Sequence, residues 1–283
     1  AICSPLTIYK GIRKLEPGKA LFVSKDSLQC HTYYDISYHP DYSKNESYWV
    51  DAIRQEIEKA VNVYVPLSPV DKTGCFLSGG TDSSSVAGYY TELTEKPAKT
   101  FSIGFDEAGY NELDYAHIAA NHFGTDQKDY YVTPEDVTSL IDALPRIYDE
   151  PFGNASVVPA YYCARMAREN GIQVLLGGDG GDEIFGGNER YVTNLVFEKY
   201  FILPKTVRQT LLEPLVAQLP AKGLVYKAGR YIRRANMRNP QRFFSYNLLA
   251  ETDPQQIFKP DFLAALDTDC FINLAKRHYN SAA

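Results

Sequence analysis

The stretch Phe76-Leu77-Ser78-Gly79-Gly80-Thr81-Asp82-Ser83-Ser84-Ser85 joins the end of a short apolar strand to two glycines, an acid and a run of hydroxyls. Apolar residues then recur at the spacing of one helix face, at Val86, Ala87, Tyr90 and Leu93. A strand, a glycine turn and a helix start in this order predict a backbone cradle for an anion. Glycines let backbone N–H groups approach oxygens closely, and the helix N-terminus adds unpaired donors.

Asp82 indicates which kind of anion the cradle suits. A carboxylate would repel a bare phosphate, so we expect Mg²⁺ to bridge Asp82 and the phosphates. The stretch is neither G-x-x-x-x-G-K-S/T, because no lysine follows the glycines, nor G-x-G-x-x-G. S-G-G-x-D-S instead resembles the signature of the PP-loop ATP pyrophosphatases, which bind ATP and cleave it between the α- and β-phosphates. A serine-capped turn without a ligand is the alternative.

The composition is that of a globular protein with ample core. The chain has 283 residues, a hydrophobic fraction of 45%, a net charge of −6 and a pI of about 5.5, which allows one large domain or two modest ones. Five scattered cysteines without a C-x-x-C pair indicate neither a zinc knuckle nor a redox pair. We expect Cys75 and Cys163 in the core. Neither a signal peptide nor a bilayer-length apolar run is evident, so a cytoplasmic protein without a membrane partner is expected.

One basic stretch runs against the acidic balance. Its seven cations are Lys222, Lys227, Arg230, Arg233, Arg234, Arg238 and Arg242. A solvated helical face is the preferred interpretation, and a phosphate or RNA contact is the alternative. Nucleic acid is therefore an unlikely partner for the chain as a whole.

The first 45 residues differ from the rest of the chain. Lys19–Val23 and Gln29–Tyr34 predict a strand pair that is too small for a core of its own. Ser43 and Glu46 then predict a capping box at the start of a helix. We therefore divide the chain into residues 1–45, the tail of a domain, and residues 46–283, a second domain.

Strands and helices alternate after residue 72, as in a doubly wound, mostly parallel α/β sheet. The expected strands are Thr73–Leu77, Lys99–Gly104, Lys128–Val132 and Ile172–Leu176. The expected helices are Asp82–Leu93, Glu112–Phe123, one opened by the Thr133-Pro134 cap, and Ser156–Asn170 with Gly171 at its C-terminal end. After about residue 188 the strand signal ends, and the apolar pattern of Val207, Leu211, Leu215 and Leu219 and of Phe243, Phe244, Leu248 and Leu249 predicts a helical cover.

A second glycine-rich loop follows the last predicted strand. Gly177-Gly178-Asp179-Gly180-Gly181-Asp182-Glu183-Ile184-Phe185-Gly186-Gly187 places three acids among six glycines. Parallel sheets bind ligands beyond the carboxyl ends of their strands, so this loop, the cradle and Ser102-Ile103-Gly104 are predicted to meet. Asp82 and Asp182 could hold Mg²⁺ from two strand ends. A solvated acidic turn is the alternative.

Several motifs in order resemble the synthetase domain of glutamine-hydrolysing asparagine synthetases. They are S-G-G-x-D-S-S, T-F-S-I-G-F-D, D-E-P and G-D-G-G-D-E-I-F-G-G, preceded by Ile8–Gly18, which resembles the end of that family's glutaminase domain. The resemblance implies that ATP adenylates the side-chain carboxylate of aspartate, or of a related acid, that pyrophosphate leaves with Mg²⁺, and that ammonia attacks. It also implies ammonia from a glutaminase domain of the same full-length chain, and a possible homodimer.

The resemblance assigns roles to residues of this chain. Pyrophosphate and its metal fall to Ser78, Gly79, Gly80, Asp82, Ser83 and Ser84, the adenosine pocket to Leu77, Ile103 and Gly178, and the second metal contact to Asp182. Asp179 is expected beside the reacting carboxylate, where family members carry Glu, so the acceptor acid stays open. Glu150 could reach the substrate amine or could cap the following loop.

The family also places a reactive lysine beyond a point equivalent to Ala283. We therefore expect the 283-residue chain to be inactive alone. The resemblance of Ile8–Gly18 implies that residues 1–45 are the tail of a glutaminase domain. Two other classes stay open, a tRNA-modifying PP-loop enzyme and a non-catalytic nucleotide-binding relative. His117 and His122 miss the i, i+4 metal spacing and are expected to be ordinary structural or surface residues.

Overall fold

The computed structural model describes residues 2–106, 111–151, 154–218, 222–244, 254–267 and 269–281. The chain divides into two compact units. The first comprises Ala1–Asp35 with His39–Ile184, and the second comprises Ile36–Tyr38 with Phe185–Ala283.

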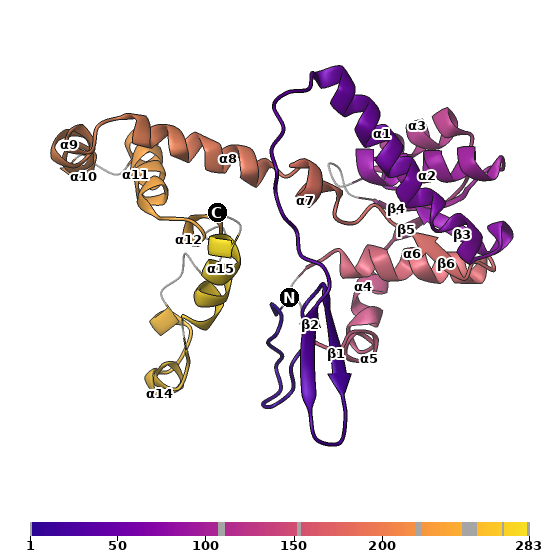
Figure 1. Cartoon of the computed structure of the whole chain (residues 1–283), viewed down its shortest axis with the longest axis horizontal. Helices are drawn as coiled ribbons and strands as arrows, with labels where there is room; N and C mark the ends of the chain where they lie inside the picture. The colour runs from indigo at the N-terminus through magenta and orange to yellow at the C-terminus, as the bar shows by residue number, and fades with distance from the viewer. Residues whose placement is uncertain are drawn as a thin grey trace. The chain divides into compact units, whose positions relative to one another are not determined.

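The first unit is built on a parallel sheet, which confirms the predicted α/β class (Figure 1). Its strands are short and lie in the order β5-β4-β3-β6. Leu77 continues the ladder by one bond, because its N–H donates to Phe101 O at 3.0 Å. The strands are β3 (Thr73–Phe76), β4 (Lys99–Phe105), β5 (Asp126–Val132) and β6 (Val174–Leu176).

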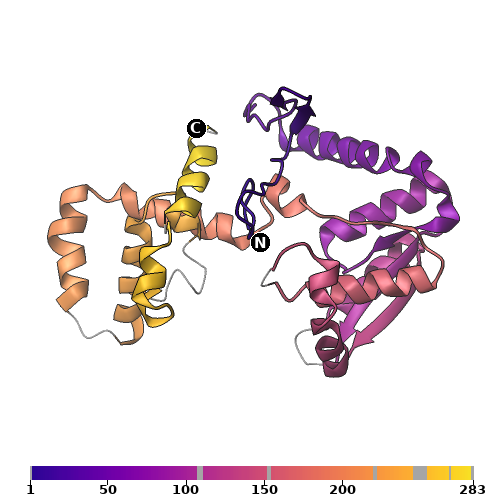
Figure 2. The same cartoon turned by 90° about the horizontal axis from the view of Figure 1, so that it is seen from below.

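Helices cover both faces of this sheet. Successive side chains of each strand point to opposite faces, so both faces carry apolar side chains that helices can bury. Cys75 and Leu77 pack with helices on one face, whereas Phe76 and Phe101 belong to the cluster against α6 on the other. Figure 2 shows α6 across one face of the sheet. The first face carries α1 (Glu46–Asn62), α2 (Thr81–Thr94) and α3 (Leu113–Phe123), with turns η1 (Val65–Leu67) and η2 (Val70–Lys72) between α1 and β3; the other carries α4 (Pro134–Ile141), α5 (Leu144–Ile147) and α6 (Val157–Glu169).

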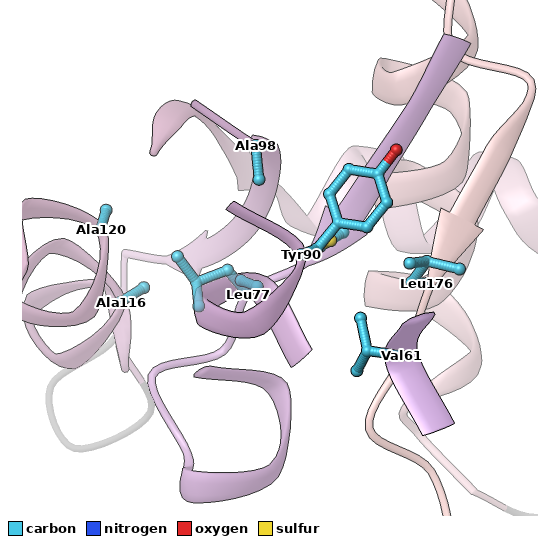
Figure 3. Packing of buried hydrophobic residues seen from close by; sticks show 9 residues of the cluster. Val61, Leu77, Tyr90, Ala98, Ala116, Ala120 and Leu176 are labelled. Atoms are coloured by element: carbon cyan, nitrogen blue, oxygen red, sulfur yellow. The ribbon is translucent and has the colours of Figure 1, made fainter. Parts of the chain in front are cut away.

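The core of the first face is tightly packed around Tyr90 and Leu77 (Figure 3). Both are almost fully buried, and small residues of α3, Ala116 and Ala120, let that helix approach them. Cys75 lies in the same cluster and Cys163 in the cluster around α6, as predicted. The core therefore fixes the end of β3, from which the glycine loop starts.

The order of connections creates a switch point in the sheet. α2 and α3 connect β3 to β4 and β4 to β5 on one face, whereas α6 leads back to β6 on the other side of β3. The loops after β3 and β6 therefore leave adjacent strands at the same edge of the sheet. Open α/β sheets bind ligands in the crevice at such a point.

The helix caps show which local predictions were right. Thr133 is the N-cap, as predicted, and it forms a capping box: its hydroxyl accepts from Asp136 N, and its own N–H donates to the Asp136 carboxylate. The capping box at Ser43 is wrong, because Asn45 accepts from Tyr48 N at 3.0 Å and starts α1. Gly171 follows the C-cap Asn170 with φ +79°, a conformation that suits glycine at this position.

The N-terminal strand pair is confirmed as an antiparallel hairpin. It consists of β1 (Lys19–Val23) and β2 (Leu28–Thr32), which begins one residue earlier and ends two residues earlier than predicted. Tyr33 N and Tyr34 N both donate to Gly18 O, so the chain beyond β2 still follows the hairpin without a full ladder. The division at residue 45 stays a prediction.

The second unit is helical, and none of its described residues lies in a strand. Val207, Leu211 and Leu215 lie on one helical segment that contains a π turn. The other predicted positions, Leu219, Leu248 and Leu249, lie outside the described residues. After α7 (Gly181–Phe185), the elements are α8 (Glu189–Glu198), η3 (Lys199–Ile202), α9 (Lys205–Val207), η4 (Arg208–Leu212), α10 (Glu213–Gln218), α11 (Gly223–Asn236), α12 (Gln241–Phe244), η5 (Pro254–Gln256), α14 (Pro260–Ala264) and α15 (Cys270–Ser281).

Arg242 is not part of a solvated basic face, contrary to the prediction. Its side chain is 2% exposed, donates to Asn194 Oδ1 at 2.8 Å and pairs with Glu198. The other cations of the stretch lie on or beside α11, and five of them are exposed, namely Lys222, Lys227, Arg230, Arg233 and Arg238. Within the described residues no helix is both long and apolar enough to cross a membrane.

Candidate functional site

A cavity of about 830 Å³ lies at the carboxyl ends of the sheet strands. The loops after β3 and β6 form one side of it, and residues of β4, α3 and α6 complete the lining. The structure thus brings together the three strand ends that the sequence predicted to meet. The predicted site residues in the lining are Leu77, Ser78, Gly80, Asp82, Ser83, Ile103, Gly178, Asp179 and Asp182.

The loop after β3 is held by the hydroxyl of Ser83. Ser83 Oγ accepts from Ser78 N at 3.1 Å, lies 2.9 Å from Ser78 Oγ and donates to Gly80 O at 3.3 Å. Ser78 Oγ in turn accepts from Gly80 N at 3.3 Å. These bonds close the loop on itself before α2 begins at Thr81.

Two residues predicted to bind phosphate do not line the cavity. Gly79 has φ +82° and lies against α3, where an added Cβ would collide with the backbone of Ala116. Ser84 Oγ is buried and has no hydrogen-bond partner in the described part of the chain. Gly79 therefore turns the loop, and Ser84 points into the protein.

The loop after β6 touches the loop after β3 through its glycines. A Cβ at Gly178 would lie 2.7 Å from the backbone carbon of Asp82 and 2.8 Å from Ser83 N. A Cβ at Gly181 would collide with the Asp82 carboxylate. The bare glycines therefore allow Asp82 to lie directly against the second acidic loop.

The charge of the cavity is strongly one-sided. Five carboxylates line it, and within the described residues no lysine, arginine or histidine does; the acids are Asp82, Glu112, Asp179, Asp182 and Glu183. A polyphosphate would be repelled here unless cations accompanied it. Carboxylate oxygens are hard ligands that suit Mg²⁺.

The residues present fit a metal ion that takes some of its ligands from the protein and the others from a substrate. The described residues hold no cluster of three or more His, Cys, Asp and Glu side chains arranged to bind a metal. Mg²⁺ is commonly held by one or two carboxylates plus substrate phosphates rather than by an all-protein cage. Asp82 and Asp182, one from each loop, supply that number of carboxylates.

The opposite wall of the cavity is apolar, and sequence reasoning found only part of it. Phe101 and Phe105 join Ile103 in the lining, together with Pro159 and Ala160 of α6. Strand alternation could have found Phe101 and Phe105, because residues 101, 103 and 105 share one face of β4. No local pattern marks the α6 residues, because the fold alone brings them there.

Cys163 also lines this wall without being a nucleophile. Burial raises the pKa of its thiol to about 12, and its S–H donates to Phe101 O at 3.4 Å. A thiol with so high a pKa stays protonated at neutral pH. Cys163 is thus an apolar part of the wall, as its predicted core position implied.

Glu150 lies outside the cavity. Its carboxylate pairs with Lys14 Nζ at 2.5 Å, and Lys14 also donates to Ile2 O at 2.6 Å. Glu150 borders a separate hollow of about 380 Å³, lined by residues such as Ile8, Leu144 and Val157. The structure therefore joins Glu150 to the segment before β1.

The two predicted structural histidines also lie outside the cavity lining. His117 Nε2 lies 2.6 Å from Asp129 Oδ2, and the His122 ring packs edge-on against Phe123 with centroids 4.7 Å apart. Both contacts are the ordinary kind that the sequence predicted.

The family profile and the most similar curated relatives indicate one family. The asparagine synthase family profile matches residues 52–273. A protein of Methanocaldococcus jannaschii that carries the name of a glutamine-hydrolysing asparagine synthetase is 35% identical over 268 residues, covering 91% of this chain and 50% of its own. Asparagine synthetase 1 of Bacillus subtilis, also named glutamine-hydrolysing, is 29% identical over 78% of this chain and 34% of its own.

Among solved structures, the ammonia-dependent NAD synthetase of Campylobacter jejuni aligns with a TM-score of 0.33 and 13% identity, over 65% of this chain and 93% of its own. That TM-score is too low to carry an argument, so the assignment depends on the sequence matches. This chain spans about half the length or less of the curated relatives described above. The family profile and the 35% identical relative together place the chain in the asparagine synthase family.

Proposed function

We propose that this chain carries the ATP-dependent, amide-forming part of a glutamine-hydrolysing asparagine synthetase. The acceptor would be aspartate or a related carboxylic acid, which is adenylated with release of pyrophosphate and then attacked by ammonia. The observation that carries the proposal is the meeting of two glycine–acid loops in one carboxylate-lined cavity of the asparagine synthase family. The two loops provide a backbone cradle and hard oxygen ligands, and β4 and α6 provide an apolar wall for the adenine base.

The loop after β3 would hold the leaving pyrophosphate. The N-terminus of α2, which begins at Thr81, favours an anion at this point. Ser78 and Ser83 keep the loop closed through their hydroxyls. Negative charge grows on pyrophosphate as it leaves, so fixed donors here stabilise the transition state more than the ground state.

Asp82 and Asp182 would hold the Mg²⁺ that accompanies ATP. The bound ion would reduce the electrostatic repulsion between the phosphates of ATP and the five carboxylates of the cavity. Without it, the same carboxylates would oppose nucleotide binding. Leu77, Ile103 and Gly178 would line the adenosine side, where the wall is largely apolar.

Asp179 would lie beside the reacting carboxylate and contribute to the choice of acceptor. An added Cβ at Gly177 would lie 2.8 Å from Asp179 Oδ2, so the Asp179 carboxylate folds back over its own loop. The side chain is one methylene shorter than the Glu that the resemblance implies. A shorter reach leaves more room for the acceptor acid, which is why aspartate is only the first candidate.

The source of ammonia belongs to the same proposal. We infer that a glutaminase domain of the full-length protein supplies it. The cytoplasmic location, the homodimer and the inactivity of this chain alone stay predictions.

Calorimetric titration with ATP tests the proposal directly. We expect binding with Mg²⁺ and none with EDTA, and equal affinity in both would remove the metal roles of Asp82 and Asp182. Pyrophosphate release by the full-length protein across a panel of amino and sugar acids then identifies the acceptor. Titration with tRNA separates the RNA-modifying alternative, which depends on the exposed cations around α11 and would require tRNA binding without amide formation.

A further inference from the structure

A chain of polar side chains leads from the surface of α3 to the base of the glycine loop. His117 Nε2 contacts Asp129 Oδ2 at 2.6 Å, and Asp129 Oδ1 accepts from Gln127 Nε2 at 2.8 Å. The same Gln127 Nε2 donates to Ser102 Oγ at 3.0 Å, and Ser102 Oγ donates to Leu77 O at 2.6 Å. The family resemblance assigns no role to Gln127 or Asp129.

This series of hydrogen bonds has a direction, because the side chains differ in what they can donate. Gln127 Nε2 can only donate, so Ser102 Oγ must accept from it. The single hydroxyl proton of Ser102 is then free for Leu77 O. Ser102 is 2% exposed and Leu77 is also 2% exposed, so water does not replace this bond.

Leu77 is where the chain leaves the sheet. β3 ends at Phe76, and the Ser102 hydroxyl bonds the next carbonyl just before Ser78 starts the loop. The direction of this peptide unit sets where the following N–H groups of the loop point. A shift at Leu77 O would therefore move the whole predicted cradle.

We propose that Gln127, held by Asp129, is a positioning residue that fixes the Ser102 hydroxyl on Leu77 O and thereby aims the glycine loop at its ligand. This inference rests on the proposed function, because the ligand is taken to be Mg·ATP. It adds β5, which supplies no residue of the cavity lining, to the machinery of the site.

Gln127→Glu tests the direction of these hydrogen bonds with almost no change in the shape of the side chain. A carboxylate at residue 127 can only accept, so Ser102 would turn its proton away from Leu77 O. Gln127→Met removes the donor but leaves the Ser102 proton free for Leu77 O. We expect the Kd for Mg·ATP to rise about tenfold in Q127E and by less than about threefold in Q127M.

Two further variants separate the proposed cause from repulsion and from added charge. Q127E with Asp129→Asn removes the repulsion between two acids and should still bind weakly. Gln173→Glu adds the same charge next to the amino end of β6, at an exposed residue, and should leave the Kd unchanged. Ser102→Ala should weaken binding as Q127E does, and Ser102→Thr, which keeps the hydroxyl, should restore it.

Amide hydrogen exchange of residues 78–83 without nucleotide gives a second readout. Exchange should be faster in Q127E than in the wild type, Q127M or Q173E, at equal midpoints of thermal unfolding. If Q127E binds Mg·ATP as tightly as the wild type, or if neither variant changes loop exchange, the positioning role is wrong. If the wild type fails to bind Mg·ATP but Q127E still speeds loop exchange, the proposed function fails while the positioning role stands.

Discussion

The two loops that meet at the cavity are built in opposite ways. The loop after β3 is held by side chains, because Ser83 alone makes three polar contacts within it. The loop after β6 is packed through positions that lack side chains, since its glycines let the Asp82 region lie against it. One loop thus supplies order and the other supplies room, and each should fail differently when altered.

The acids of the two loops should show the largest difference. Asp82→Asn is expected to weaken Mg·ATP binding about 10- to 100-fold, because it removes a charged ligand of the ground-state metal. Asp179→Asn in the full-length protein should lower kcat more than nucleotide affinity, because Asp179 is assigned to the reacting carboxylate. Calorimetry for both variants and steady-state kinetics for the second decide. Loss of nucleotide binding in Asp179→Asn would reverse the two roles.

The glycines of the second loop should separate stability from binding. Gly178→Ala places a Cβ 2.7 Å from the backbone of Asp82, which cannot move cheaply, so the free energy of unfolding should fall by about 1–3 kcal/mol. Gly181→Ala meets only the end of the Asp82 side chain, which can rotate away. Its unfolding free energy should change less, while Mg·ATP affinity falls as in Asp82→Asn.

Urea unfolding and calorimetry on these two variants give the comparison. Gly186→Ala is a control that adds backbone strain without a steric clash, because Gly186 has φ +72° and no atom lies within 4 Å of an added Cβ. If Gly181→Ala destabilises the protein as strongly as Gly178→Ala, Asp82 is more rigidly held than its contacts indicate.

The serines of the first loop should show a smaller effect. Ser83→Ala leaves Ser78 N–H without its partner and should cost about 1–2 kcal/mol of unfolding free energy. Ser85→Ala is the matched control, because Ser85 Oγ only donates to Thr81 O on the exposed side of α2. That variant should change stability by no more than about 0.5 kcal/mol. Equal thermal midpoints for the two variants would show that the loop holds its shape without Ser83.

The same contrast explains what the sequence could predict. Strand, turn and helix at Phe76–Ser85 are local patterns, and parallel-sheet topology then brings the loop after Leu176 to the same edge. Ser84 lies outside the cavity lining, and spacing alone does not say which face of a first helical turn meets a ligand. The partner of Glu150 is Lys14, 136 residues earlier, and no local pattern predicts so distant a contact.

Arg242 and Gln127 are two polar residues for which local sequence patterns also fail to predict the contacts. A basic run normally predicts solvent exposure, but Arg242 is buried because Asn194 and Glu198 of α8 satisfy it. Gln127 carries no signal in the sequence, because its role depends on Ser102 across the β4–β5 pair. Long-range partners therefore decide the residues that local rules misjudge.

Gly80 should give the smallest change in stability and the clearest division between folding and binding. It is the N-cap of α2, with φ −70° and no side chain to accept from the first turn. Serine is a better N-cap than glycine by a few tenths of a kcal/mol, and alanine is worse. Gly80→Ser should therefore raise the free energy of unfolding slightly, and Gly80→Ala should lower it slightly.

Both side chains would nevertheless stand at the edge of the cavity, which Gly80 lines. Each should reduce the rise in thermal midpoint that Mg·ATP produces, because a Cβ keeps phosphate away from the loop backbone. The comparison to run is thermal unfolding of both variants with and without Mg·ATP. A stabilised Gly80→Ser variant with an undiminished ligand shift would mean that glycine at residue 80 serves the turn and not the ligand, and that phosphate approaches the loop from another side.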